Sequence, residues 1–365
     1  MIRTVAIAYS DRGAPVDGIR DHSERIIEQL RRDFPELRVK YFDLRGEGSG
    51  LSARVVAAVR MLRGLDNACA LILQYNPFSF GRWGFAPWLP GTLAAARLRR
   101  GHPFIAVMVH EPFVPMTSIR WTLLGSWQRL QLAALRSCAD VTFVSIGAWQ
   151  DVLRRSPARG PVYHLPVGSN FPDRRASREA FRSALGVREE ELVVSTLGRD
   201  HPSWMGDYVV AAANAMAAAG TRVRLLGIGA TTPPLTGLDP AICFERPGLL
   251  EPGEVAGRLA ASDLFLAPLI DGVSTRRGSV MAGLQHGLPM IGTEGPLTDQ
   301  VLADAKDALV LTPVGRPEEF AATAARLAEE PEARERMGAA ARRLYECQFD
   351  WSVVASRLHA ALPIG

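Results

Sequence analysis

Short apolar runs of strand length alternate with longer amphipathic stretches along the whole chain. In the first half the apolar runs are TVAIAY, VKYFDL, ALILQY, FIAVMV and VTFVSI, and helices are predicted over residues 21–33, 51–64 and 120–138. In the second half they are LVVSTLG, VRLLGIG, ICFERPG, LFLAPL, LPMIGT and ALVLT. This alternation is typical of strands joined by helical crossovers, so the pattern predicts an α/β chain with parallel sheets.

A connector separates the two runs of strands. It reads PVGSNFPDRRAS and is rich in Pro, Gly, Ser and charged residues, which interrupt regular structure. Five or six strands on each side of it predict two doubly wound domains. The final segment spaces Trp351, Val354, Leu358 and Leu362 at helical intervals, so this helix needs an apolar surface on which to dock.

Composition narrows the class of protein. The 365 residues are 47% hydrophobic and 22% charged, the balance of an ordinary globular enzyme, which excludes a disordered chain and a collagen-like repeat. The four cysteines are widely separated and favour reduced thiols over a disulfide or zinc framework. No apolar run approaches the roughly 20 residues of a membrane span. We expect a cytoplasmic protein without a signal peptide, peripheral at most at the inner face of a membrane.

Charge is unevenly distributed along the chain. Residues 1–170 hold 22 Lys and Arg against 13 Asp and Glu, whereas residues 171–365 hold 20 against 25. Between residues 51 and 136 ten arginines are accompanied only by Asp66 and Glu111. The basic half indicates either a solvated surface or an anionic partner such as a membrane or a phosphorylated acceptor. Nucleic acid is excluded as a substrate, because these arginines are not interleaved with a stacking platform.

Candidate site residues of the first half follow predicted strands. Gly18 precedes a helix and either lets a ligand approach the backbone or forms a structural turn. His110 and Glu111 follow the fourth strand, where a histidine either contacts a sugar hydroxyl or is satisfied within the fold. Tyr75 opens the aromatic stretch QYNPFSFGRWGFAPW, which is expected to line an acceptor pocket or to cover the core.

Candidate anion-binding residues cluster in the second half. Gly198 and Arg199 follow the first strand there, and Arg199 is either a diphosphate ligand or part of a salt bridge. The segment DGVSTRRGS then combines tight backbone, hydroxyl donors and two arginines before a helix, with Ser279 as a candidate N-cap. Such a helix N-terminus favours a nucleotide diphosphate over a merely solvated loop. The predicted donor-binding residues there are Asp271, Gly272, Val273, Ser274, Thr275, Arg276, Arg277, Gly278, Ser279 and the more distant Glu294.

Taken in order, several motifs resemble those of the GT-B-fold glycosyltransferases, and within them the retaining, family 4-like enzymes of group 1. These motifs are VHE (109–111), VSIGAWQDVL (144–153), LPVGSNF (165–171), LGR (197–199), SDLFLAP (262–268), DGVSTRRGS (271–279), HGLPMIGTEG (286–295) and FDWSVV (349–354). The resemblance implies two Rossmann-like domains facing across a cleft, with the last helix crossing back to the first. Residues 1–170 with helix 349–365 would bind the acceptor, and residues 171–348 the nucleotide sugar.

The resemblance also implies an activity: transfer of a sugar from a nucleoside diphosphate to an acceptor hydroxyl, with retention, without a metal and without a cofactor. Arg199, Arg276 and Arg277 would hold the diphosphate, while His110 and Asp271 would contact the sugar. Gly18, Tyr75, His110 and Glu111 would form the acceptor side. The acceptor is expected to be anionic or lipid-linked.

Two departures from the family pattern leave alternatives open. Met205 stands where the family has a lysine beside the diphosphate, and the second of two family glutamates is absent near Ala282. A non-catalytic GT-B partner subunit would explain these losses. A nucleotide-sugar 2-epimerase shares the fold but needs carboxylates for proton transfer, for which Glu111 and Glu294 are the main candidates.

Overall fold

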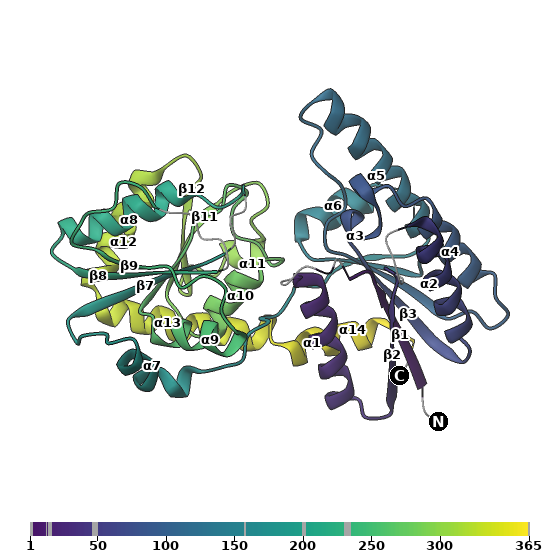
Figure 1. Ribbon diagram of the computed structural model, residues 1–365, viewed down its shortest axis with the longest axis horizontal. Coiled ribbons are helices and arrows are strands. Elements are labelled where there is room, and N and C mark those ends of the chain that lie inside the picture. Colours follow the sequence, from purple (N-terminus) through teal and green to yellow (C-terminus); the bar gives the residue numbers. More distant parts are fainter. Residues whose placement is uncertain are drawn as a thin grey trace. The chain divides into compact units, whose positions relative to one another are not determined.

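The computed structural model describes residues 3–11, 13, 17–45, 50–156, 158–198, 202–229 and 235–363. The chain forms two compact units (Figure 1). Unit 1 comprises Met1–Pro166 and Trp351–Gly365, and unit 2 comprises Val167–Asp350. The sequence-based boundaries, 170/171 and 348/349, lie within a few residues of these divisions. No helix in the described ranges combines the length and apolarity that crossing a membrane requires.

Unit 1 is built on a six-stranded sheet in the order β2-β1-β3-β4-β5-β6, in which every pairing is parallel. Its strands are β1 (Arg3–Tyr9), β2 (Leu37–Asp43), β3 (Ala68–Tyr75), β4 (Phe104–Val109), β5 (Val141–Val144) and β6 (Val162–His164). Its helices are α1 (Gly18–Asp33), α2 (Leu51–Gly64), α3 (Pro77–Phe80), α4 (Trp88–Arg97), α5 (Ile119–Cys138), α6 (Gly147–Arg154) and α14 (Trp351–Ala361), with a 3₁₀ turn at Arg82–Gly84. Of these strands, β6 has no counterpart among the predicted runs.

The C-terminal helix finds its docking surface on unit 1. Trp351, Val354 and Leu358 of α14 are buried in one cluster with Ile26 and Leu30 of α1, on one face of the sheet (Figure 1). The opposite face packs against α2, α4 and α5. The predicted return of the last helix to the first domain is therefore confirmed.

Unit 2 repeats the architecture with the strand order β12-β11-β10-β7-β8-β9, again entirely parallel. Its strands are β7 (Glu191–Leu197), β8 (Arg222–Ile228), β9 (Cys243–Glu245), β10 (Leu264–Ala267), β11 (Met290–Glu294) and β12 (Leu309–Pro313). Its helices are α7 (Arg178–Ala184), α8 (Gly206–Ala218), α9 (Pro252–Ala261), α10 (Gly278–Gln285), α11 (Gln300–Ala303), α12 (Pro317–Glu329) and α13 (Pro331–Gln348), with a 3₁₀ turn at Arg175–Ser177. One face carries α8 and α12, and the other carries α9, α10 and α13.

The strand orders locate the expected ligand positions. In sheets of this type ligands bind beyond the carboxyl ends of the strands, where the strand order reverses. In unit 2 the order reverses between β7 and β10, and in unit 1 between β1 and β3. The loops after β7 and β10 therefore meet at one edge of the unit 2 sheet, and those after β1 and β3 at one edge of the unit 1 sheet.

Candidate functional site

The loop that follows β10 turns sharply at Gly272. This residue has φ +81°, and a Cβ added to it would overlap the Thr298 hydroxyl and the backbone nitrogen of Gly295. Both the positive φ and the close approach exclude a larger side chain. Glycine at this position thus allows the loop after β10 to lie directly against the loop after β11.

Backbone hydrogen bonds join these two loops. Val273 N–H donates to the Thr293 carbonyl and Leu297 N–H donates to the Asp271 carbonyl, both at 2.9 Å. The Thr293 hydroxyl is fully buried and donates to the Leu269 carbonyl at 2.6 Å. The segment that begins at Asp271 is therefore supported by the neighbouring strand and is not a freely solvated loop.

Thr275 has a structural partner that the sequence analysis did not identify. Its backbone N–H and its hydroxyl both donate to one carboxylate oxygen of Asp299, at 2.7 and 2.8 Å, and both residues are buried. Asp299 is the N-cap of α11, yet its side chain makes no capping bond. The proton of the Thr275 hydroxyl is thus directed to Asp299, and the role of Thr275 in donor binding stays a prediction.

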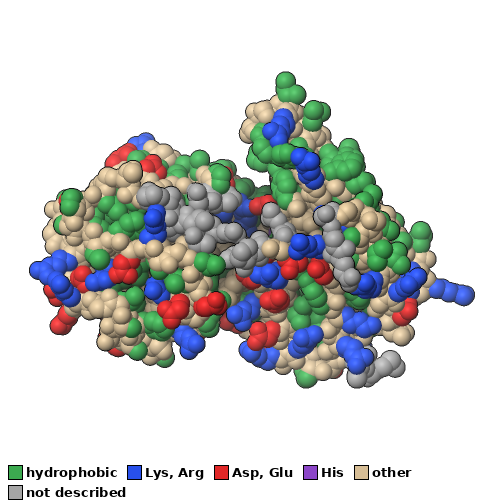
Figure 2. All heavy atoms as spheres, in the orientation of Figure 1, with side chains coloured by type: hydrophobic (Ala, Val, Ile, Leu, Met, Phe, Trp, Pro, Cys, Tyr) green, Lys and Arg blue, Asp and Glu red, His purple; other side chains and the backbone are tan. Residues whose placement is uncertain are grey.

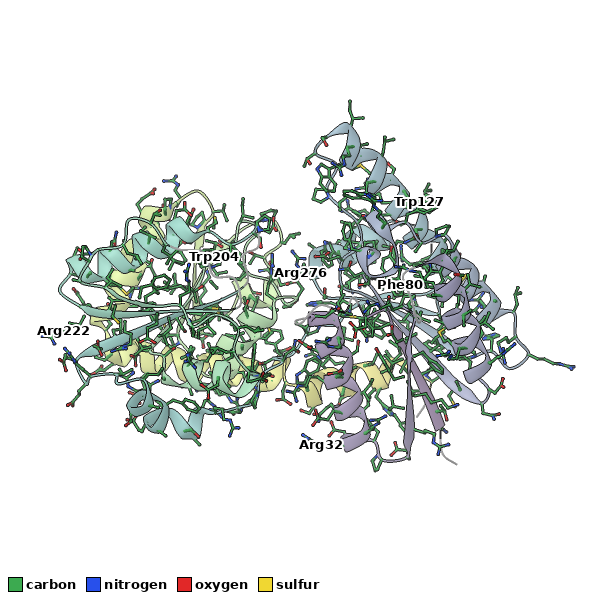
Figure 3. All side chains as sticks on the ribbon, viewed as in Figure 1. Arg32, Phe80, Trp127, Trp204, Arg222 and Arg276 are labelled. Carbon is green, nitrogen blue, oxygen red and sulfur yellow. The ribbon has the colours of Figure 1, made fainter. Side chains whose placement is uncertain are left out.

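The two arginines lie at the start of α10 with one carboxylate beside them. The terminal nitrogens of Arg276 and Arg277 each lie 4.0 Å from the Asp271 carboxylate, whose side chain is 40% exposed. Arg276 is at the rim of unit 2 (Figure 3). The N-cap of α10 is Arg277 and not Ser279, which lies inside the first turn. Within the described residues, two cations and a helix N-terminus thus lie beside one partly exposed carboxylate.

The segment that precedes α8 borders the same loop. Arg277 donates a hydrogen bond to the Ser203 hydroxyl at 2.8 Å, and Ile270 N–H donates to the Ser203 carbonyl at 2.8 Å. Met205 N–H donates to the Pro268 carbonyl at 3.1 Å. The position where the family carries a lysine therefore lies beside the end of β10. Gly198 directly follows β7 and lies next to this segment, whereas the prediction for Arg199 falls outside the described residues.

Ala282 lies where the family that the sequence resembles has its second glutamate. Ala282 is fully buried in the core cluster under α10, so a carboxylate at that position would face the protein interior. Ser279, one turn earlier, is partly exposed. At the position of the missing glutamate the chain thus has a small, buried core residue. Glu294 ends β11 with an exposed side chain.

In unit 1, His110 is held just beyond β4. Its Nε2 lies 2.7 Å from the Oε1 of Gln74, and its ring meets the His22 ring edge-on with centroids 4.8 Å apart. Both histidines are buried, and desolvation holds the pKa of His110 well below its usual value. Burial thus favours the neutral imidazole, with Nε2 facing the amide oxygen of Gln74.

The other acceptor-side predictions have different outcomes. Glu111 accepts a hydrogen bond from Asn76 at 3.1 Å and lies beside His110 at the strand edge. Tyr75 is a correction: it is fully buried, and its hydroxyl accepts a bond from Gln131, so it belongs to the core. Gly18 begins α1, and a Cβ there would meet no atom within 4 Å. Packing of the described chain does not require glycine at this position.

Several residues of these sites escaped the sequence analysis. Asp17 caps α1 through bonds from the N–H groups of Ile19 and Arg20, and it could have been found as an acid immediately before a helix. Ser203 and Asp299 carry no comparable local signal. Their partners lie 74 and 24 residues away in sequence.

No protein-family model and no curated protein sequence matches this chain. Solved structures do match over nearly its full length. Sucrose-phosphate synthase from Thermosynechococcus elongatus has a TM-score of 0.71 at 15% identity, with 98% of both chains covered. Anabaena HepE in complex with UDP and glucose gives 0.67 at 14% identity, with 99% of both chains covered. WaaG, a glycosyltransferase involved in lipopolysaccharide biosynthesis, gives 0.66 at 14%, with 99% and 100% covered. The chain therefore has the GT-B fold.

Proposed function

Given this fold, we propose that the protein is a glycosyltransferase that moves a sugar from a nucleoside-diphosphate donor to an acceptor hydroxyl, with retention and without a metal. One observation carries the proposal: Arg276 and Arg277 flank the first turn of α10 at the topological switch point of unit 2. That is where sheets of this kind bind nucleotides. The similar Anabaena HepE was solved with UDP and glucose, which supports the same donor class here.

The donor site would act by electrostatics. As the bond to the sugar breaks, negative charge develops on the departing diphosphate, and preorganised cations stabilise it without reorganisation. Arg277 is oriented by its bond to Ser203, and the loop beneath both arginines is held by the loop after β11. Asp271, together with the Gly272–Ser274 backbone, would hold the sugar hydroxyls, with Gly198 and Arg199 beside the diphosphate.

On the acceptor side, His110 would orient a hydroxyl and not transfer a proton. Its buried, neutral ring has one nitrogen committed to Gln74, so it offers a fixed hydrogen-bonding group of known orientation. Glu111, held by Asn76, is the nearest carboxylate along the chain. In this division of roles the bond between the sugar and the diphosphate breaks, the acceptor oxygen bonds to the sugar, and the proton of the acceptor hydroxyl passes to the departing diphosphate oxygen.

A surface on unit 1 supports a lipid-linked acceptor and a peripheral contact with the inner face of a membrane. Ile119, Leu123 and Leu130 of α5 are 85%, 71% and 66% exposed, and they fall within about 40° of one another around the helix. Trp83 and Phe85 are exposed beside them, and Arg120 lies over the Trp83 ring at 4.5 Å. We call these five apolar residues the α5 face. Figure 2 shows green side chains with blue arginines covering the projecting end of this helix.

The test is a binding panel followed by product analysis. Thermal unfolding is measured with UDP-, GDP-, TDP- and ADP-sugars; nucleotide at 100 times its dissociation constant stabilises a fold by about 2.7 kcal/mol. The stabilising donor is then incubated alone and with a lipid extract, and the anomeric configuration of the product is read by NMR. A new sugar epimer from donor alone would identify an epimerase. Absence of any stabilisation would leave a non-catalytic subunit and refute the proposal.

A further inference from the structure

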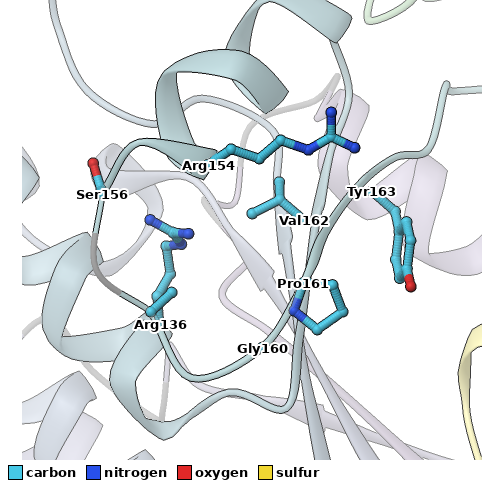
Figure 4. Close-up of a pocket in the computed structure, with 8 residues that line it drawn as sticks. Arg136, Arg154, Ser156, Gly160, Pro161, Val162 and Tyr163 are labelled. Atoms are coloured by element: carbon cyan, nitrogen blue, oxygen red, sulfur yellow. The ribbon is translucent and has the colours of Figure 1, made fainter.

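A pocket of about 260 Å³ opens at the edge of unit 1 opposite to His110 (Figure 4). It lies at the amino ends of β5 and β6, whereas His110 follows the carboxyl end of β4. Its lining comes from the ends of α5 and α6 and from the chain that enters β6, and includes Arg136, Arg154, Ser156, Gly160 and Tyr163. This pocket is therefore separate from the acceptor residues proposed above.

Arg136 is the unusual residue of this pocket. It is 1% exposed and is the largest fully buried side chain of the described residues. Its Nε is buried without a partner, and within the described part of the chain its side chain forms neither a hydrogen bond nor an ion pair. Figure 4 shows its guanidinium pointing into the space between Ser156 and Val162. A buried charge without a partner is strongly unfavourable, so this arginine needs an anion that the described residues do not supply.

The acidic residues nearest to Arg136 in the sequence either bind other groups or are exposed to solvent. Asp140 accepts hydrogen bonds from Arg97 at 3.0 Å, from Arg159 at 3.4 Å and from the N–H of Ile105 at 2.9 Å. Asp151 is 72% exposed and lies 4.0 Å from Arg154 at the rim. Burial lowers the pKa of Arg136 from its usual value, as expected for a desolvated cation whose charge is not balanced. The pocket therefore has an excess of positive charge.

We propose that this pocket binds a phosphate group, with Arg136 at its floor, Arg154 at its rim and the Ser156 hydroxyl as a further donor. Guanidinium groups recognise phosphate through paired, charge-assisted hydrogen bonds. At about 30 Å³ per water molecule, the volume holds roughly eight or nine waters, which leaves room for a phosphate group and part of the molecule that carries it. That carrier is either a small soluble compound or a lipid headgroup.

The test compares phosphate binding by the full chain and by Arg136→Met, which keeps an apolar side chain of similar length and removes the charge. Inorganic phosphate is titrated calorimetrically at constant ionic strength. We expect saturable binding by the parent and a loss of about 10- to 150-fold in affinity for Arg136→Met, the effect of one charge-assisted hydrogen bond. Arg155→Ala, which removes the same charge from an exposed residue outside the lining, should leave the affinity unchanged.

A second arm identifies the carrier. Co-sedimentation with phosphatidylcholine vesicles, with and without phosphatidic acid, is measured for the same variants. Vesicle binding that requires both phosphatidic acid and Arg136 assigns the pocket to a lipid headgroup. Arg136-dependent binding of inorganic phosphate, without Arg136-dependent binding to the vesicles, assigns it to a soluble ligand. Should Arg136→Met not fold, Arg154→Gln and Ser156→Ala replace it, because both positions lie at the pocket's rim. Equal affinities in parent and lining variants, in both arms, would overturn the proposal.

Discussion

The guanidinium of Arg277 donates a hydrogen bond to the hydroxyl of Ser203 at 2.8 Å. This contact joins the start of α10 to the segment that carries Met205, two residues further along the chain. In the family that the sequence resembles, that segment supplies a lysine to the diphosphate. Here the Arg277 guanidinium reaches the same segment from the loop after β10, and we propose that Arg276 and Arg277 take over the function of the absent lysine.

We therefore predict that Arg276→Ala and Arg277→Ala each lower turnover by about 10- to 150-fold, since a charge-assisted hydrogen bond contributes about 1.5–3 kcal/mol. Steady-state kinetics with the donor found in the binding panel would measure this. Arg336→Ala on α13 removes a 72% exposed arginine from the same unit and should not change turnover.

A second substitution tests whether the lost positive charge causes the lower turnover. Met205→Lys restores a cation beside the end of β10, so in the Arg277→Ala background it should recover part of the lost turnover. If both arginine variants turn over donor at the parental rate, the pair is only a solvated surface.

Thr275→Val and Thr312→Val form a matched pair of variants for measuring the free energy of unfolding. The Thr275 hydroxyl bonds to buried Asp299, so Thr275→Val should cost about 1–3 kcal/mol by leaving that carboxylate incompletely satisfied. The Thr312 hydroxyl is buried without a partner among the described residues, so Thr312→Val should be neutral or stabilising. Urea unfolding compares the two variants. Equal losses for both would contradict the structural role of the Thr275–Asp299 contact.

Buried histidines predict loss of stability in acid. Desolvation lowers the pKa of His22 to about 4, so the unfolded chain, with a histidine pKa near 6.5, binds more protons between these values. Stability should therefore fall as the pH drops from about 6.5 to 4, by about 2 kcal/mol at pH 5 for this residue. His22→Phe should reduce that slope, whereas His102→Gln, at an exposed position, should not. Denaturant melts at pH 7 and pH 5 would show whether the slope changes.

The α5 face predicts membrane binding that needs both apolar contact and charge. Leu123→Ser should weaken co-sedimentation with vesicles that contain anionic lipid, and added salt should weaken it further. Leu249→Ser, at a 60% exposed position in unit 2, serves as the control. If neither Leu123→Ser nor added salt changes binding to these vesicles, the α5 face is not a membrane contact and the acceptor is expected to be soluble.

Local patterns in the sequence determined most of the fold. Runs such as ALILQY and LFLAPL became β3 and β10, the predicted helix over 51–64 matches α2, and the stripe of Trp351, Val354 and Leu358 became the buried face of α14. These features depend on periodicities of two and 3.6 residues, which act between neighbours in the chain. The same reasoning placed Arg276 and Arg277 before a helix, because strand, loop and helix follow one another directly.

The tertiary structure alone decided which of these residues meet. Whether the Thr275 hydroxyl meets Asp299, whether Tyr75 lines a pocket or the core, and whether Arg136 finds a counter-ion all depend on segments distant in sequence. Parallel strands bring their loops together according to their order in the sheet, and β7 lies beside β10 although two strands separate them along the chain. Periodicity carries no information about that order, and so Ser203 and Arg277 become neighbours only when the sheet has formed.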